Sequence, residues 1–275
     1  MRVVILSSSV YSETASAMAV RLTQAGHVPV GALALRALNR GTLLRKVGQW
    51  GLRGVMDYAR AKVVPSRGNR PGVLQNSYLR PWLEYRGRTL RSLREVATVY
   101  DFPVALCSDQ NLPRSVKQLT KWSPDVIVFA GGNILRRPLL NVPRIGVLNA
   151  HLGLLPEIRG MSSPEWSLLK DVPLGITIHY IDEGIDTGHV LRRCELSNPT
   201  HSESISDLRH RLTAFGIDKM AEVVAALDRG EICATPQSQI NNDTQFFVLH
   251  DRLRALAADR LERLRTPTTA GSLHD

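Results

Sequence analysis

The sequence has few cysteines, no long apolar run and no dinucleotide-binding fingerprint, and each absence argues against a class of protein. Its three cysteines are widely spaced and odd in number, which argues against a disulfide framework and a cysteine-based zinc site. No eighteen consecutive residues are apolar, so a membrane-spanning helix is not expected. No Gly-x-Gly-x-x-Gly follows the first apolar run, which disfavours a dinucleotide-dependent dehydrogenase.

The first residues, Met1 to Leu6, form a short apolar run that ends in serines. No cleavage site of small residues follows, so we interpret the run as a first strand and not as a signal peptide. The cysteines are expected to be buried small hydrophobes in a reducing compartment. These features predict a cytoplasmic protein with no metal ion and no membrane attachment.

The positive charge of the chain is concentrated in one segment. The net charge is +10, and residues 36–95 hold 14 Lys and Arg against three acidic residues, a local balance of +11. Such a concentration indicates an anionic partner near this segment. A solvated, arginine-rich surface explains the same count.

Strand-like and helix-like segments alternate along most of the 275 residues, of which 43% are apolar. This order predicts an α/β fold with a Rossmann-like, mostly parallel sheet and helices on both faces. A segment at about 38–93 does not fit the alternation, and we interpret it as a basic insertion after the second strand, either a flap over the substrate or a passive surface addition. The expected strands are 2–6, 27–35, 103–107, 125–130, 146–149, 174–181 and 189–196, and the clearest helices are 13–25 and 203–227.

Three polar residues suggest an acyl-transfer site. Asn149 and His151 end an apolar strand with one residue between them, so their side chains point the same way and both can bind one carbonyl oxygen. Asp186 lies in a later loop between two glycines, where a carboxylate can orient the histidine and accept a proton from an amine. Each has an ordinary structural alternative, and Asp182 and Glu183 compete with Asp186 within the same loop.

The motifs around these residues resemble the formyltransferases that use 10-formyltetrahydrofolate. The resemblance is specific in order and spacing, and it extends over about residues 96–230. One departure is Gly153, because the family usually has serine before its Leu-Leu-Pro. The matching motifs are Asn149-Ala150-His151, Leu154-Leu155-Pro156, Arg159-Gly160, Gly175–His179 and Asp186-Thr187-Gly188.

The resemblance implies roles for particular residues. Asn149, His151 and Asp186 would be catalytic, and 10-formyltetrahydrofolate would be the co-substrate, with its pterin between two loops. The cofactor-binding residues implied are Gly132, Asn133, Ile134, Leu135, Ile181, Asp182, Glu183 and Gly184. The substrate-binding residues implied are Ser8, Ser9, Tyr11 and His179.

The resemblance also implies a formyltransferase catalytic domain at 1–230, including the insertion, and a short C-terminal extension at 231–275. The acceptor that we expect is the primary amine of a small molecule, first a nucleotide-linked amino sugar. A methionyl-tRNA formyltransferase-like enzyme is the alternative, disfavoured because about 45 residues after the last long helix do not suffice for that family's C-terminal barrel. A non-enzymatic RNA-binding module is the third interpretation, although nucleic acid is not the expected partner, and a homodimer is one option for assembly.

Overall fold

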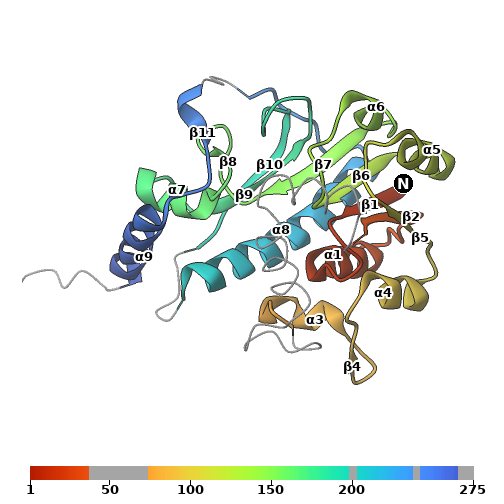
Figure 1. Ribbon diagram of the computed structural model, residues 1–275, viewed down its shortest axis with the longest axis horizontal. Helices are drawn as coiled ribbons and strands as arrows, with labels where there is room; N and C mark the ends of the chain where they lie inside the picture. The colour runs from red at the N-terminus through yellow and green to blue at the C-terminus, as the bar shows by residue number, and fades with distance from the viewer. Residues whose placement is uncertain (37–73, 198–202, 238–241, 266–275) are drawn as a thin grey trace, which may run out of the picture. The chain divides into compact units, whose positions relative to one another are not determined.

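The computed structural model describes residues 1–36, 74–197, 203–237 and 242–265 (Figure 1). The chain divides into two compact units, Met1–Val147 and Leu148–Asp275, and each is described by itself. The division that the sequence suggested, at residue 230, stays a prediction. Of the three cysteines, only Cys107 is buried, whereas Cys233 is exposed, so the expectation of buried cysteines is wrong for Cys233.

Four parallel strands form the core of the first unit. They are β1 (Val3–Ser7), β2 (Gly31–Leu35), β5 (Val104–Cys107) and β6 (Val126–Ala130), in the order β6-β1-β2-β5. Every residue of β1 is buried, as expected for a central strand covered on both faces. Because β1 pairs with β6 in register up to Ser7 and Ala130, the loops that follow these two strands begin side by side at the carboxyl edge. The chain reverses its direction across the sheet at this point, where ligands of such sheets usually bind.

Helices cover both faces of these strands (Figure 1). On one side, α1 (Glu13–Gln24) packs against α4 (Leu93–Tyr100), and α5 (Pro113–Trp122) lies on the other. Helix α1 begins where the Ser12 side chain accepts a hydrogen bond from the amide of Ala15, which caps it. Trp122 of α5 lies so close to Gly31 that a Cβ there would be 2.6 Å from the indole, so the absence of a side chain brings this helix onto the sheet.

Part of the basic insertion is described. Residues 37–73 lie outside the described residues; the remainder forms η1 (Ser77–Leu79), α3 (Arg80–Leu83) and a short hairpin of β3 (Glu84–Tyr85) and β4 (Arg88–Thr89). The amides of Gln75 and Asn76 donate to the Glu13 carboxylate at 2.9 and 3.1 Å. This end of the insertion is therefore attached to the first turn of α1.

The second unit holds an antiparallel arrangement of strands. Strand β9 (Gly175–Tyr180) pairs antiparallel with β7 (Gly146–His151) on one side and with β10 (Val190–Glu195) on the other. The long helix α8 (Ile205–Asp228) packs against β9 and begins at a capping box formed by Ser204 and Asp207. A Cβ on Gly216 of α8 would be 3.3 Å from the side chain of Ala150, so this glycine brings the helix close to β7.

The C-terminal residues return to the strand-and-helix region of the second unit. Strand β11 (Gln245–Phe246) follows η2 (Asn242–Thr244) and pairs in parallel with β8 (Arg159–Gly160). The ring of Phe246 stacks on Trp166 of α7 (Ser163–Lys170) at a centroid distance of 4.7 Å. Helix α9 (Asp251–Arg265) follows and packs against α7. Leu253, Leu256, Leu261 and Leu264 lie at roughly helical spacing along α9, whereas no sequence pattern marks β11.

The predicted α/β fold with a mostly parallel sheet is confirmed, with α6 (Arg137–Leu140) as a short addition before β7. The bounds of every strand expected from the sequence agree with an observed strand to within a few residues, because each is a short apolar run bounded by turn residues. Within the described part of the chain, no helix has the length and apolar character needed to cross a membrane.

Candidate active site

Asn149 and His179 face each other across the pair β7 and β9. They are register partners, so their side chains lie on the same face. His179 Nδ1 lies 2.8 Å from the carbonyl oxygen of Tyr180, and a carbonyl can only accept, so Nδ1 carries a hydrogen. In the neutral ring Nε2 is then an acceptor, and it takes a hydrogen bond from Asn149 Nδ2 at 3.2 Å. This contact fixes which way the Asn149 amide points.

Burial keeps His179 neutral. The side chain is 1% exposed, and burial lowers its pKa to about 4, because a charged ring loses its hydration there; the nearby Asp186 carboxylate opposes this shift. At neutral pH the ring therefore stays an acceptor for Asn149. His179, predicted to contact substrate, is placed where it orients the neighbouring amide.

His151 is the second histidine of the cluster, and it is 6% exposed. Its Nε2 donates to the carbonyl oxygen of Ile158 at 2.8 Å, which fixes the ring orientation in the same way. Its Nδ1 faces Asp186 Oδ2 at 3.4 Å. This distance is longer than a normal hydrogen bond, so Nδ1 lies beside the carboxylate without a short bond to it.

Asp186 holds its carboxylate between the two histidines. Oδ2 accepts a 2.8 Å hydrogen bond from the amide of Gly160, and Oδ1 lies 3.6 Å from His179 Nε2. The residue has φ of +53°, a left-handed conformation that non-glycine residues adopt mainly at special sites. Of the rival carboxylates, Asp182 instead bonds Gly184 and Thr187 within its own loop.

Thr177 forms two hydrogen bonds with the chain segment that follows His151. Its hydroxyl donates to the carbonyl of Gly153 at 2.8 Å and accepts from the amide of Leu155 at 3.0 Å. A Cβ on Gly153 would lie 3.1 Å from His151 Nε2. Glycine in place of the family's serine thus relieves a tight contact with the histidine, and Thr177 supplies hydrogen bonds to this loop.

Gln237 holds the Asp186 loop from a distant part of the sequence. Its Nε2 donates to the carbonyls of Asp186 and Gly188 at 2.9 and 2.7 Å. These two bonds constrain the backbone of a loop in which Asp186 has a positive φ. No local motif marks Gln237, so the sequence gave no signal for it.

In the first unit, the predicted cofactor loop follows β6 and the predicted substrate residues follow β1. Gln110, which is completely buried, links them: its Nε2 donates to the carbonyls of Ser7 and Gly131, and its Oε1 accepts from the amide of Asn133. A Cβ on Gly132 would lie 1.9 Å from Gln110 Oε1, so the loop requires glycine at this position.

The predicted ligand-contacting residues of this unit are accessible except Leu135, which is buried at 5% exposure. Ile134 and Tyr11 are 75% and 70% exposed, and Ser8 is also exposed. Ser9 is half-buried, and its hydroxyl accepts from the amide of Tyr11. The remaining predicted cofactor residues, Ile181 to Gly184, belong to the second unit, and 182–184 are exposed there.

The cluster in the second unit therefore contains Asn149, His151, Asp186 and His179. It has hydrogen-bond donors that suit a developing oxyanion and a carboxylate that can take a proton, which is the chemistry that a group-transfer site needs. Across the described residues no group of three His, Cys, Asp or Glu side chains is arranged to hold a metal ion.

Comparisons with known proteins point to the same kind of chemistry as the side-chain cluster. Residues 94–224 match the family model described as "Formyl transferase", so this segment is similar to the formyl transferases, as its motifs suggested. A methionyl-tRNA formyltransferase of Syntrophus aciditrophicus is 35% identical over 156 residues, 55% of this chain and 50% of that protein. One of Syntrophomonas wolfei is 29% identical over 194 residues, 62% of this chain and 60% of that protein. The chain thus spans about half the length of the curated relatives it matches.

Solved structures share the fold. A glycinamide ribonucleotide transformylase of Symbiobacterium toebii superposes with a TM-score of 0.57 and 15% identity, covering 86% of this chain and 95% of that one. A sugar N-formyltransferase of a Shewanella species gives 0.52 and 17%, covering 94% of this chain and 87% of that one. At these identities the likeness concerns the fold alone.

Proposed function

We propose that this protein transfers the formyl group of 10-formyltetrahydrofolate to a primary amine. The observation that carries the proposal is the cluster of Asn149, His151 and Asp186, in which Asn149 Nδ2 bonds His179 at 3.2 Å and His151 Nδ1 lies 3.4 Å from the Asp186 carboxylate. Formyl transfer needs both hydrogen-bond donors and a proton acceptor, because the carbonyl oxygen gains negative charge while the attacking amine must lose a proton.

The two donors would act on the formyl oxygen. Asn149 Nδ2 carries two hydrogens and gives one to His179, so the other can bind the oxygen. His151 donates Nε2–H to Ile158, so its protonated form adds a donor at Nδ1. Removing a donor of this kind costs about 100- to 1000-fold in rate in a dry site.

Asp186 would accept the proton that the attacking amine loses. As the amine nitrogen bonds to the formyl carbon, the C=O bond opens to an oxyanion and the nitrogen becomes acidic. Asp186 takes this proton directly or through a water. When the intermediate collapses, the bond to N10 breaks and N10 receives a proton, so the products are the formamide and tetrahydrofolate.

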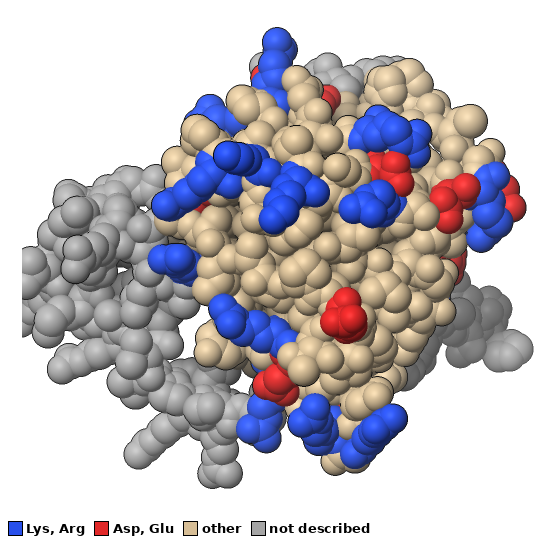
Figure 2. All heavy atoms as spheres, turned by 90° about the vertical axis from the view of Figure 1, so that its right-hand side faces the viewer, with Lys and Arg blue, Asp and Glu red and all other residues tan. Residues whose placement is uncertain are grey.

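The acceptor that we now place first is methionyl-tRNA, which was the second choice on sequence grounds. The supporting observation is that the curated relatives at about 30–35% identity are methionyl-tRNA formyltransferases. The face of the molecule in Figure 2 carries many more Lys and Arg than Asp and Glu side chains, which suits an RNA acceptor.

A nucleotide-linked amino sugar is the second candidate. Its support is the polar turn before α1, where Ser9 and Ser12 lie at a helix N-terminus. Such a terminus favours a phosphate, and a nucleotide-linked sugar carries two.

An acceptor panel tests the proposal. The protein is incubated with 10-formyltetrahydrofolate and, separately, methionyl-tRNA, nucleotide-linked amino sugars or glycinamide ribonucleotide, and released tetrahydrofolate and formylated product are both measured. We expect stoichiometric transfer to methionyl-tRNA. Transfer to a sugar alone would support the second candidate, and no transfer to any amine would contradict the function.

A further inference from the structure

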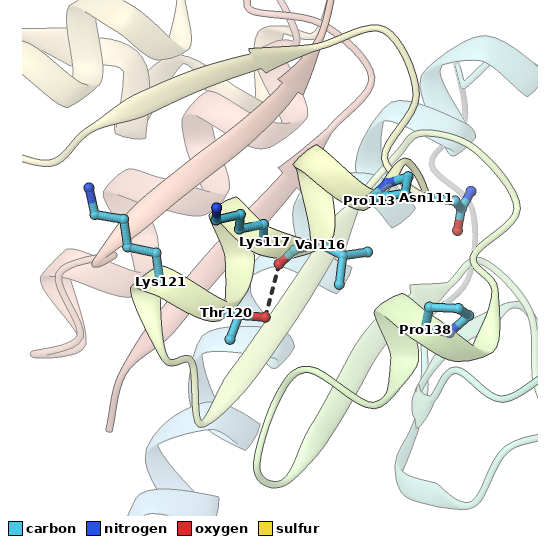
Figure 3. Close-up of a pocket in the computed structure, with 7 residues that line it drawn as sticks. All are labelled: Asn111, Pro113, Val116, Lys117, Thr120, Lys121 and Pro138. Carbon is cyan, nitrogen blue, oxygen red and sulfur yellow. Dashed lines mark hydrogen bonds between the residues drawn. The ribbon is translucent and has the colours of Figure 1, made fainter.

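Arg159 is a buried cation in the second unit. It is 3% exposed, and among the described residues it is the only lysine or arginine that is buried. By contrast, Lys117 and Lys121, which line the cavity drawn in Figure 3, are both exposed. A guanidinium keeps its charge at any ordinary pH, so burying it is unfavourable unless hydrogen-bond acceptors surround it. The acceptors that Arg159 reaches therefore indicate its role.

Two of these acceptors come from segments that are distant in the sequence. One guanidinium nitrogen, Nη1, donates to the carbonyl of Ile185 at 3.3 Å, and Nε donates to the hydroxyl of Thr244 at 3.2 Å. Thr244 is the last residue of η2, in the C-terminal part of the chain. The residue after Arg159, Gly160, donates its amide to Asp186 Oδ2 at 2.8 Å. Strand β8 therefore contacts both the backbone before Asp186 and its carboxylate.

The Ile185 carbonyl belongs to the peptide unit that precedes Asp186. Because a peptide unit is planar, the direction of this carbonyl also sets the position of the Asp186 amide. On the other side of the residue, Gln237 donates to the carbonyl of Asp186 at 2.9 Å. Side chains therefore hold both peptide units that flank a φ of +53°. A non-glycine residue keeps this disfavoured conformation only where its surroundings fix it.

We infer that Arg159 is a positioning residue for Asp186 and that Thr244 holds Arg159 in place. The inference rests on the proposed function, in which Asp186 receives the proton of the amine. Arg159 acts only through the backbone before Asp186, which directs the carboxylate toward His151 Nδ1, 3.4 Å away. Arginine suits this task because its planar guanidinium donates in two fixed directions at once. Thr244 lies outside residues 94–224, which match the family model, so a C-terminal segment of this chain takes part in shaping the site.

Single-turnover formyl transfer by R159Q and T244V tests the inference, with the acceptor that the panel identifies. Glutamine is too short to bind both acceptors, so the carboxylate should lose its fixed position. The rate from pre-bound 10-formyltetrahydrofolate should then fall by about 10- to 100-fold, because a misplacement of about 1 Å can cost as much. T244V keeps the shape of its side chain and removes one hydrogen bond, so it should fold and show a smaller fall in rate. The Kd of tetrahydrofolate should stay within about two-fold of wild type in both variants.

Two control proteins separate positioning from a general structural role. In the D186N background, R159Q should lower the rate by no more than about two-fold, because the carboxylate that Arg159 positions is absent. R260Q removes another guanidinium of the second unit, which donates to the carbonyls of Leu168 and Leu169. This variant should keep the wild-type rate, because these carbonyls lie outside the Asp186 loop.

Hydrogen exchange of the Gly160 amide tests the same contacts without donor or acceptor. This amide donates to Asp186, so it should exchange about three- to ten-fold faster in R159Q and T244V, and at the wild-type rate in R260Q. Unchanged Gly160 exchange, or a loss of rate in R159Q that recurs in full in the D186N background, would overturn the inference even if the wild-type protein transfers formyl groups. Faster exchange in a protein that transfers no formyl group would leave the positioning of Asp186 standing and contradict the proposed function.

Discussion

Burial of a neutral His179 makes the stability of the fold depend on pH. The folded-state pKa is about 4, whereas an exposed histidine titrates near 6.5, so the difference is about 2.5 units. Because the folded pKa is lowered, the unfolded chain binds the proton first as pH falls. At 1.36 kcal/mol per unit, the free energy of unfolding should drop by about 3 kcal/mol between pH 6.5 and pH 4.

The perturbation that isolates this contribution is His179→Gln. Glutamine has no titratable proton in this range, so the loss between pH 7.0 and pH 4.5 should be smaller by about 2.4 kcal/mol than in the wild-type protein. Urea unfolding at pH 7.0, 6.0, 5.0 and 4.5 measures the free energy for both proteins. Groups remote from His179 titrate in both proteins and cancel in the difference, whereas Asp186 and His151 interact electrostatically with the ring and do not cancel. Parallel curves for the two proteins over this range would refute the assignment of a buried neutral ring.

Two further substitutions test residues that shape the loops. Gly132→Ala should destabilise the protein by about 1–3 kcal/mol in urea unfolding, because its Cβ would overlap Gln110. The control is Gly87→Ala, at a positive φ but with open space around it, which should destabilise the protein less. Equal destabilisation by the two substitutions would contradict the clash. Gln237→Leu should lower kcat for formyl transfer at least about ten-fold and leave the folate KM nearly unchanged, because the Asp186 loop loses two hydrogen bonds of about 1 kcal/mol each. A change in the folate KM alone would argue against a positioning role for Gln237.

Local patterns account for what the sequence predicted well. The strands β1 and β6 are short apolar runs, and Asn149 and His151 share a face because side chains alternate along a strand. The family motif then singled out Asp186, and the structure brings its carboxylate to His151 at 3.4 Å. The strand predictions and the shared face of Asn149 and His151 depend only on spacing and on residues close together in the chain, whereas the choice of Asp186 over Asp182 and Glu183 came from the resemblance.

Contacts between distant segments account for what the sequence did not predict. Gln110 and Gln237 are ordinary glutamines in sequence, and their importance comes from the backbone groups they bind 20 to about 100 residues away. The pairing of β11 with β8 has the same origin, since a two-residue strand carries no periodicity. The acceptor that we propose first also changed, because the curated relatives are methionyl-tRNA formyltransferases, whereas the sequence argument had placed an amino sugar first.

Single-turnover formyl transfer by Asp186→Asn tests the central claim most directly. Asparagine is isosteric and tolerates the left-handed backbone at this position, so the variant should fold and still bind tetrahydrofolate. With no carboxylate to receive the amine proton, the rate from pre-bound 10-formyltetrahydrofolate to saturating acceptor should fall by about 100- to 10,000-fold. A rate within about three-fold of wild type would contradict the account, because the proton would then leave the amine without Asp186.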